Sequence, residues 1–481
     1  MSAASPSPAE PAASMRGPMP MVPVPVSEVY AIAQEYIDAG RLDAAERMLG
    51  HMLAVAPNQP DALQARGLIA FRRDRLQEAA ALMERGLAAG GSRPVHWRNI
   101  SEVYRQLGRL VEAVAAGRRA ISLDPADPLG PFNLAMVLYD RMDVRGSLAA
   151  ARHCVDLRSE LPQGRMKLAQ VLLAMGELSE GWQHYEWRYR IPGAQPLMPP
   201  TDRKQWEGQN LGAERLLLIG DQGYGDVLMF ARYVSWARSR TPEVALACSR
   251  EIEPILGRMF PDVPRFTQWD KIPPYTCFCP LSGLPRLHGT TLANIPPAEP
   301  LFRPDPAKVA RWRERIDRAL PAGLRRIGIA WAGRPTHNND RNRSLPLSAF
   351  APLGAVEGVA LVSLQKGPAA AAAKEWQGRA PLLDLDAEIT DFEDTAAIVD
   401  GLERVICVDT SVGHLAGAMG RPAWVLLPFA PDWRWLTERS DSPWYPTLRL
   451  FRSPGPKRLG EAVTAAAAAL AGADAGGTAV G

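Results

Sequence analysis

The chain has 481 residues, enough for two or three domains that each bury a core of their own. Apolar residues make up 47% of it, and its 55 basic and 52 acidic side chains leave a net charge of +3. This balance gives no overall footprint for nucleic acid, local basic patches aside, and no apolar run has the length of a membrane span. We therefore expect a globular protein that neither binds nucleic acid nor spans a membrane.

The five cysteines are scattered along the chain and odd in number (Cys154, Cys248, Cys277, Cys279 and Cys407). This pattern favours reduced, mostly buried thiols in a cytoplasmic protein over a disulfide framework. Cys277 and Cys279 have the wrong spacing for a zinc site and lack a second pair. We therefore predict a cytoplasmic location and no metal site.

The first 25 residues are rich in Pro, Ala, Ser and Met, and prolines interrupt the apolar run Met21–Val26. A secretory signal needs a continuous apolar segment, which this run is not. We expect a flexible tail over residues 1–25 and a second flexible tail over residues 471–481.

A period of 34 residues runs through residues 26–195. Two series of small residues follow it: Ala33, Gly67, Ser101, Ala135 and Ala169, and Ala45, Ala79, Ala113, Ser147 and Gly181. An apolar series accompanies them at Leu53, Leu87, Ile121 and Val155. Such spacing predicts helix–turn–helix units, in which small residues lie where two helices cross and large apolar residues fill the seam to the next unit. The alternative, helical hairpins without a shared period, does not account for ten small residues in register.

The unit resembles the tetratricopeptide repeat, with Trp97 and Tyr104 at the usual aromatic positions of the third unit. Turns between helices are predicted at Gly40–Leu42 and Gly108–Leu110. The five units span residues 26–59, 60–93, 94–127, 128–161 and 162–195. The fifth is aromatic around Trp182–Arg188, and we interpret it as a capping unit that packs on the next domain. The resemblance implies a protein or peptide partner on the concave face of the repeats.

From about residue 212 short apolar runs alternate with helical stretches. Strands are predicted at Arg215–Gly220, Val244–Cys248, Ile327–Trp331, Ala360–Leu364, Arg404–Val408 and Ala423–Leu427. Helices are predicted at Asp226–Arg238, around Glu251–Phe260, and at Pro306–Leu320, Asp391–Leu402 and Ser411–Met419. This alternation implies parallel sheets with ligands at the carboxyl ends of the strands. The predicted fold is an all-α solenoid followed by two Rossmann-like α/β lobes, which are joined near residues 297–310 and enclose a cleft.

A glycine-rich turn, Gly220–Leu228 (GDQGYGDVL), follows the first predicted strand. Glycines such as Gly223 and Gly225 let the backbone approach a ligand closely, and free amides at a helix start attract anions. Asp226 on this turn would face the cleft and accept a proton from an acceptor hydroxyl. The alternative is that Asp226 is only the N-cap of the helix. The missing third glycine argues against a dinucleotide fingerprint.

A second turn carries Asp409, Thr410 and Ser411 from a strand to the start of a small-residue helix that contains Gly413. Hydroxyls and backbone amides in this position can hold a diphosphate, whose charge the helix dipole favours. His414 lies one turn into the helix, within reach of the same phosphate or of a sugar hydroxyl. A lone helical histidine is more often structural, but this context favours ligand binding.

The segment Asp409–His414 resembles the Asp-Thr-Gly-x-x-His signature of the heptosyltransferase family (glycosyltransferase family nine), with Ser411 in place of the glycine. The turn Gly225–Val227 is similar to that family's N-terminal loop, whose Asp is the proposed general base. Bacterial proteins that fuse tetratricopeptide repeats to such a domain carry runs like Trp182–Arg188, Gln222–Tyr233, Trp331–Pro346, Ser363–Gly367 and Pro428–Tyr445, all present here in order. The likeness covers roughly residues 26–455. It implies a metal-independent GT-B fold of two Rossmann-like lobes, with a nucleotide sugar as co-substrate and no cofactor. The serine leaves the identity of the sugar donor open.

Basic and amide side chains near two strand ends complete the predicted donor site. A leaving nucleoside diphosphate needs positive charge or aimed hydrogen-bond donors. The related enzymes place a Lys in the loop that is Arg334–Ser344 here, so either Arg341 or Arg343 is its counterpart. Gln365 and Lys366 directly follow another predicted strand. The alternative is that these basic residues are only solvated charges on loops. We expect core or interdomain packing rather than a place in the cleft wall for Trp433, Trp435, Trp444 and Tyr445.

We predict an inverting glycosyltransferase in which Asp226 is the general base and His414 assists the departing nucleotide. The predicted donor-binding residues are Gly223, Gly225, Arg343, Gln365, Lys366, Asp409, Thr410, Ser411 and Gly413. The predicted domains are the solenoid (26–195), an N-terminal lobe (196–300) and a C-terminal, donor-binding lobe (301–470). Two alternatives stay open. One is a catalytically inactive repeat-plus-GT-B scaffold for protein–protein interaction. The other is a relative of the protein O-linked N-acetylglucosaminyltransferases, whose catalytic motifs are not evident here.

Overall fold

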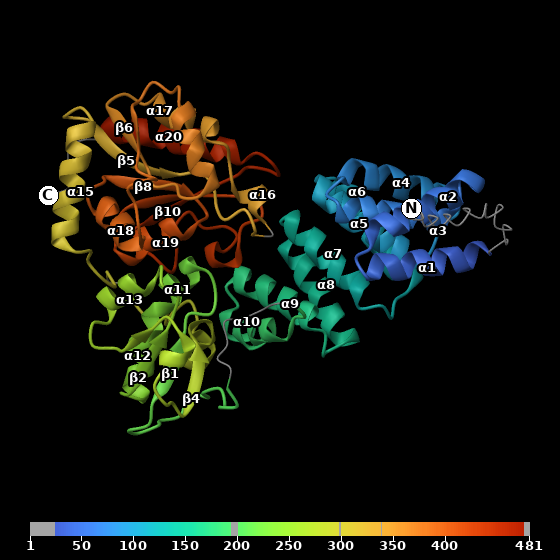
Figure 1. The fold of residues 1–481 in the computed structure, drawn as a ribbon, viewed down its shortest axis with the longest axis horizontal. Helices are drawn as coiled ribbons and strands as arrows, with labels where there is room; N and C mark the ends of the chain where they lie inside the picture. Colours follow the sequence, from blue (N-terminus) through green and yellow to red (C-terminus); the bar gives the residue numbers. More distant parts are fainter. Residues whose placement is uncertain (1–24, 194–200, 298–299, 338, 476–481) are drawn as a thin grey trace, which may run out of the picture. The chain divides into compact units, whose positions relative to one another are not determined.

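The computed structural model describes residues 25–193, 201–297, 300–337 and 339–475 (Figure 1). Of the predicted tails, residues 1–24 and 476–481 lie outside these ranges. Residues 471–475, which we expected to be flexible, continue the last helix to Ala475. The chain divides into two compact units, residues 1–107 and 108–481.

The described part of the first unit, residues 25–107, forms five helices in which neighbours along the chain pack together. They are α1 (Val26–Asp38), α2 (Leu42–Val55), α3 (Pro60–Arg72), α4 (Leu76–Ala88) and α5 (Pro94–Leu107). Ala33 and Ala45 are fully buried. A Cβ added at Gly67 would lie only 2.6 Å from Cγ of Met83, so α3 and α4 cross too closely for a side chain there.

The second unit opens with five more helices of the same pattern and a short 3₁₀ helix. They are α6 (Leu110–Leu123), α7 (Leu129–Asp140), α8 (Val144–Leu157), α9 (Pro162–Met175), α10 (Leu178–Tyr185) and η1 (Glu186–Arg190). Ser147 Oγ donates a hydrogen bond of 2.7 Å to the carbonyl oxygen of Ala135, which joins the two small-residue series at one crossing. All ten residues of these series are buried, so the prediction from the 34-residue period is confirmed.

A left-handed backbone position recurs between the helices of each repeat. It falls at Gly40, Asp74, Gly108, Met142 and Gly176, with φ between +58° and +85°. These positions also step by 34 residues, yet two of them are not glycine. The period is therefore a property of the backbone as well as of the side chains. It cannot be recognised from glycine positions alone, because Asp74 and Met142 stand where the other repeats have glycine.

Two parallel sheets follow the helices. The first has the order β3-β2-β1-β4, from β1 (Leu216–Ile219), β2 (Val244–Ala247), β3 (Arg265–Phe266) and β4 (Cys277–Pro280). The second has the order β10-β9-β8-β5-β6-β7, from β5 (Arg325–Ala330), β6 (Val359–Ser363), β7 (Leu382–Asp384), β8 (Arg404–Val408), β9 (Ala423–Leu427) and β10 (Leu448–Arg452). The predicted fold class, a helical repeat region followed by two parallel-sheet α/β lobes, is confirmed.

Helices cover both faces of the second sheet (Figure 1). In the first lobe the helices pack on one face of the sheet, and Phe266, Ile272 and Tyr275 pack on the other. The helices of the first lobe are α11 (Tyr224–Phe230), α12 (Val234–Arg240), α13 (Glu253–Met259) and α14 (Leu284–His288). Those of the second are α15 (Pro306–Ala319), α16 (Asp340–Arg343), α17 (Ala351–Gly354), α18 (Phe392–Asp400), α19 (Ser411–Ala418) and α20 (Leu459–Ala475). The single helix predicted over Asp226–Arg238 is interrupted by a 3₁₀ turn, Ala231–Tyr233.

The last repeat shares a core with the two lobes. The Trp182 ring lies edge-on to Trp433 at a centroid distance of 5.3 Å, and it contacts Phe230 at 6.3 Å and Trp444 at 6.4 Å. Tyr139 of α7 donates a hydrogen bond of 2.9 Å to the carbonyl of Pro431. The interpretation of the fifth repeat as a cap packed on the next domain is confirmed, as is the packing role of the aromatic residues after Pro428.

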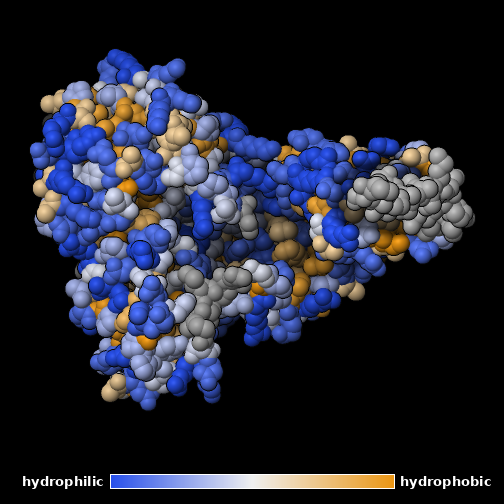
Figure 2. Space-filling view, in the orientation of Figure 1, coloured by the Kyte–Doolittle hydropathy of each residue, from blue (hydrophilic) through white to orange (hydrophobic). Residues whose placement is uncertain are grey.

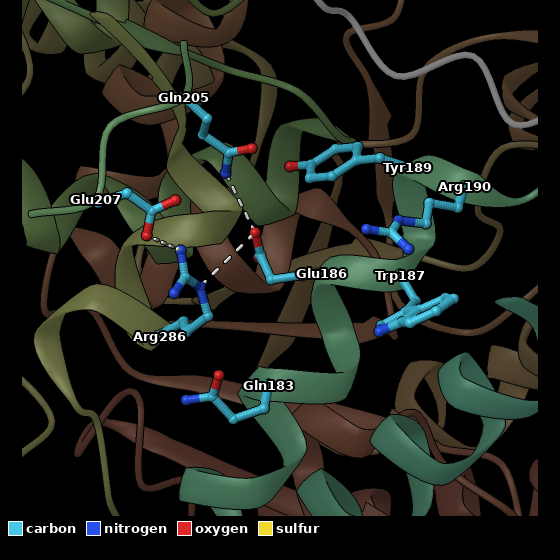
Figure 3. Close-up of a pocket in the computed structure, with 8 residues that line it drawn as sticks. All are labelled: Gln183, Glu186, Trp187, Tyr189, Arg190, Gln205, Glu207 and Arg286. Carbon is cyan, nitrogen blue, oxygen red and sulfur yellow. Dashed lines mark hydrogen bonds and ion pairs between the residues drawn. The ribbon is translucent and has the colours of Figure 1, made fainter. Parts of the chain in front are cut away.

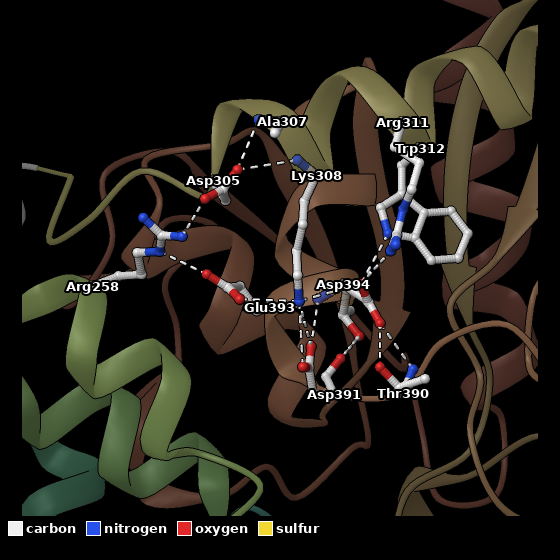
Figure 4. Close-up of polar contacts among 11 residues, drawn as sticks. Arg258, Asp305, Ala307, Lys308, Arg311, Trp312, Thr390, Asp391, Glu393 and Asp394 are labelled. Atoms are coloured by element: carbon white, nitrogen blue, oxygen red, sulfur yellow. Dashed lines mark hydrogen bonds and ion pairs between the residues drawn. The ribbon is translucent and has the colours of Figure 1, made fainter.

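A polar cluster joins the two lobes on the side of α15 (Figure 4). Arg258 of the first lobe donates to Glu393 of α18 at 2.6 Å and to Asp305, the N-cap of α15, at 2.5 Å. Asp394 is buried beneath this surface and accepts a hydrogen bond of 3.1 Å from the Trp312 indole. The lobes are thus fixed to each other by ion pairs on this side and by aromatic packing against the repeats.

The five cysteines are free thiols, four buried and Cys248 partly so, as expected for mostly buried thiols. Polar residues predominate on the face that Figure 2 shows, with apolar residues interspersed among them. Within the described ranges, no helix is both long enough and apolar enough to cross a bilayer.

Candidate functional site at two facing turns

The glycine-rich turn after β1 presents Asp226 in the first turn of α11. Gly223 is the N-cap of this helix, so the alternative that Asp226 is the cap is wrong. The Asp226 carboxylate instead accepts a hydrogen bond from Nη2 of Arg434. Burial raises the pKa of Asp226 above its ordinary value, and the Arg434 guanidinium opposes that rise. A raised pKa suits a general base that must work near neutral pH.

The turn after β8 leads into α19. Asp409 is buried, and Thr410 is the N-cap in an extended conformation whose side chain makes no capping bond. Ser411 begins the helix. Burial and the nearby Asp432 raise the pKa of Asp409 to about 6. A Cβ added at Gly413 would lie 3.2 Å from Sγ of Cys407, so this glycine serves close packing of the helix on the sheet.

The two turns meet where α11 packs against α19 (Figure 1). A Cβ added at Gly225 would lie 2.7 Å from Cδ2 of His414, so a side chain there would strike the imidazole. His414 Nδ1 lies 3.2 Å from the Tyr445 hydroxyl, and its ring is 5.1 Å from Trp435. Burial lowers the pKa of His414 to about 3, so its imidazole is neutral at physiological pH.

Like its partner Asp432, Arg434 is a charged residue of this site that sequence reasoning missed. It lies within a 3₁₀ turn, Trp433–Trp435, and its Nη1 donates to Asp432 at 2.6 Å while Nη2 bonds to Asp226. Its guanidinium lies 4.2 Å from the centre of the Trp433 ring. The available signal was an arginine flanked by two tryptophans inside the run Pro428–Tyr445, of which we considered only the aromatic residues, as packing groups.

Arg343 is the arginine of its loop that reaches the second turn. Its Nη1 donates a hydrogen bond of 3.1 Å to the backbone carbonyl of Asp409. Arg341 is exposed. Of the two candidates left open by the sequence, the structure therefore brings Arg343 to the site.

Gln365 and Lys366 are engaged in holding loops. Gln365 Oε1 accepts hydrogen bonds from the backbone amides of Trp331 and Ala332, at 3.0 and 2.9 Å. Lys366 Nζ forms an ion pair of 3.0 Å with Asp386 and donates to the Ile389 carbonyl at 3.1 Å. These contacts favour loop-positioning roles for both residues.

The last repeat also supports the glycine-rich turn directly. The Tyr185 hydroxyl donates to Gln222 Oε1 at 3.1 Å, and the Tyr189 hydroxyl donates to Asp221 Oδ2 at 3.0 Å. Ser282 donates its amide and hydroxyl to the same Asp221 carboxylate, at 3.2 and 2.5 Å. The turn that carries Asp226 is therefore held by residues from the repeats and from the first lobe together.

A separate polar pocket of about 390 Å³ lies beside the last repeat (Figure 3). It is lined by Gln183, Glu186, Trp187, Tyr189, Arg190, Gln205, Glu207 and Arg286. Glu186 accepts hydrogen bonds from Arg188 and Gln205 at 3.0 and 3.2 Å, so its charge already binds η1 to the first lobe. No predicted site residue lines this pocket, and we take the two turns as the candidate site.

Comparisons with known proteins identify the repeats. A tetratricopeptide-repeat family model matches residues 97–127. Protein FlbA of Caulobacter vibrioides is a homologue, 30% identical in an alignment of 315 residues that covers 58% of this chain and 50% of FlbA. The chain thus spans about half the length of this curated relative.

Solved structures align with about a third of the chain. MamA shares 14% identity at a TM-score of 0.30, over 33% of this chain and 93% of its own. PilF of Pseudomonas aeruginosa shares 18% sequence identity at a TM-score of 0.33, and the match covers 35% of this chain and 77% of PilF. YrrB is described as a TPR protein with an unusual peptide-binding site. It shares 15% sequence identity at a TM-score of 0.30, and the match covers 34% of this chain and 84% of YrrB. The chain is a tetratricopeptide-repeat protein with a C-terminal α/β region of two parallel sheets.

Proposed function

We propose that the α/β region is a GT-B-type, inverting glycosyltransferase that moves a sugar from a nucleotide sugar to a hydroxyl group. One observation carries this proposal. Two strand-to-helix turns from different sheets, one with Asp226 and one with Thr410 and Ser411, meet at the Gly225–His414 contact. A carboxylate thereby lies beside a helix start suited to phosphate, as group transfer from a diphosphate requires.

In this reaction Asp226 takes the proton of the acceptor hydroxyl as the oxygen attacks the anomeric carbon. The bond from that carbon to the diphosphate breaks, and its electron pair leaves with the nucleotide. Thr410, Ser411 and the amides at the start of α19 bind the diphosphate, and Arg343 adds positive charge beside them. His414 is neutral and acts as a hydrogen-bonding group rather than a cation.

We propose that residues 196–300 and 301–470 form the two lobes, with the donor bound by the second. The repeats would select the acceptor, a protein or peptide held on their concave face. Tetratricopeptide repeats commonly present such surfaces, since their apolar residues are used between units.

A panel of nucleotide sugars tests the proposal. Each is added to the full chain while thermal stability and donor hydrolysis are measured. We expect one donor class to raise the melting temperature and to be hydrolysed slowly without acceptor. A matched Thr410→Ala, His414→Ala double variant should lose both effects. If no nucleotide sugar or nucleoside diphosphate changes stability or is consumed, the proposal fails.

A scaffold without catalysis is the second candidate, and the Asp226–Arg434 ion pair favours it. A carboxylate engaged in a buried ion pair can be purely structural. The two candidates differ in what the nucleotide panel shows: a scaffold that binds partners through its repeats needs no donor hydrolysis.

A further inference from the structure

Arg434 lies between two carboxylates of different origin. Asp226 belongs to the first lobe, whereas Asp432 precedes Arg434 by two residues in the second. Nη2 bonds to Asp226 and Nη1 to Asp432, so each carboxylate uses a different nitrogen. The Arg434 side chain is 11% exposed and that of Asp226 20% exposed, so the pair is largely withdrawn from water.

Two other arginines, Arg343 of the site and Arg232 of the 3₁₀ turn after α11, have different partners. Arg343 donates to the Asp409 backbone carbonyl, and Arg232 donates to the Met229 carbonyl at 2.9 Å. Arg343 Nε also forms an ion pair of 3.5 Å with the Asp340 carboxylate. The Arg434 guanidinium is therefore the cation that neutralises the proposed general base.

This pairing conflicts with the proposed reaction as long as it persists. A carboxylate oxygen that accepts a hydrogen bond from a guanidinium is a weaker proton acceptor. A leaving diphosphate, in turn, needs cations at its oxygens. Moving one guanidinium from the base to the diphosphate would satisfy both requirements.

We propose that Arg434 is a donor-responsive switch that holds Asp226 inactive until a nucleoside diphosphate takes over its Nη2. The inference rests on the proposed function and adds a regulatory step to it. Because Nη1 serves Asp432 independently, Arg434 can release Asp226 and stay tethered to Asp432. Phosphate oxygens suit the planar fork of a guanidinium, which makes the exchange chemically matched. Asp226 then becomes a free base only when a donor is bound, which limits futile activation of water.

The switch makes Asp226 and the diphosphate competitors for one nitrogen. By linkage, removing the Asp226 charge must strengthen diphosphate binding. A purely structural ion pair predicts the opposite, because its loss would disturb the site and weaken binding.

Titration calorimetry on the full chain tests the switch with UDP, ADP, GDP, dTDP and inorganic pyrophosphate. For the diphosphate that binds, we expect Asp226→Asn to tighten binding about fivefold or more, and Arg434→Gln to weaken it about tenfold or more. The Asp226→Asn, Arg434→Gln double variant should bind no more tightly than Arg434→Gln alone, because the gain requires the freed guanidinium. Arg439→Gln, which breaks an exposed Arg439–Asp441 pair, is the matched control and should change nothing.

The outcomes distinguish failure of the switch from failure of the proposed glycosyltransferase function. Unchanged or weaker binding in Asp226→Asn overturns the switch and leaves the glycosyltransferase proposal standing. Absence of binding by every diphosphate in the panel overturns both. If Arg434→Gln fails to fold, the Asp226→Asn measurement decides, since that variant keeps Arg434 paired with Asp432.

Discussion

Asp226 combines a buried position, a basic partner and a place at the junction of two lobes, and each of these influences its chemistry. Desolvation favours its protonated form, while Arg434 favours its charged form. Its place on a glycine-rich turn was predictable, because Gly223 and Gly225 mark the turn in the sequence. Its partner was not, because Arg434 is 208 residues away along the chain and only the folded lobes bring the two together.

Replacing Asp226 with Asn preserves the shape of the side chain and removes its basic oxygen. We expect turnover to fall by about 10²- to 10⁴-fold, the usual contribution of a positioned general base. Initial rates with a saturating donor and acceptor measure this. Asp441→Asn, at an exposed ion pair, is the matched control and should leave the rate unchanged. Full turnover in Asp226→Asn would remove the base assignment.

His414 makes the stability of the second unit depend on pH. Its folded-state pKa of about 3 lies below the ordinary value of 6.5, so the unfolded chain takes up a proton first as the pH falls. Stability therefore decreases below pH 6.5, and by pH 5.5 the loss from this residue is about 1 kcal/mol. Urea unfolding followed by tryptophan fluorescence should show His414→Gln losing less stability than wild type between pH 7.5 and 5.5. Equal losses in both proteins would contradict the assigned shift.

At the level of elements, the repeats were more predictable than the lobes. Small residues with a fixed period predicted all the repeat helices, because each crossing tolerates only a small side chain. The short strand β4 was missed because its run, Cys277–Pro280, ends in a proline that argues against a strand. The last helix was missed because the alanine run in Leu459–Ala475 shows little amphipathic periodicity.

The left-handed turns of the repeats give a prediction at this scale. Met142 adopts φ +60°, which costs a residue with a Cβ about 1 kcal/mol relative to glycine. Met142→Gly should therefore stabilise the second unit by about 0.5–1 kcal/mol, as measured by chemical unfolding. Arg141→Gly is the matched control, because Arg141 has φ −81°. This variant should be less stable than wild type, since glycine gives the unfolded chain more conformational freedom. Destabilisation by Met142→Gly would show that the Met142 side chain matters more than its backbone.

The whole molecule divides after Leu107, and the later repeats belong to the same compact unit as the lobes. The sequence places a change of pattern near residue 195, since periodicity reports local structure and says nothing about which elements share a core. The packing of Trp182 against Phe230, Trp433 and Trp444 is a tertiary property that periodicity cannot reveal.

Truncation should distinguish these two divisions. A chain of residues 196–481 loses the repeat face that covers Trp433 and Trp444, and we expect it to aggregate because a large apolar patch is exposed. A chain of residues 108–481 keeps that face and should remain monomeric with native near-ultraviolet circular dichroism. Size-exclusion chromatography and circular dichroism measure both properties. A monomeric, folded 196–481 chain would show that the lobes are independent of the repeats.

The hydrogen bonds from Tyr185 and Tyr189 to the glycine-rich turn limit how this protein can be recombined. A foreign repeat array grafted at the end of the fifth repeat would replace both tyrosines and leave Asp221 and Gln222 without these two donors. A graft made before Pro162 would carry the native fifth repeat along and keep the turn supported. The splice point for exchanging specificity therefore lies at least one repeat upstream of the place where the sequence pattern changes.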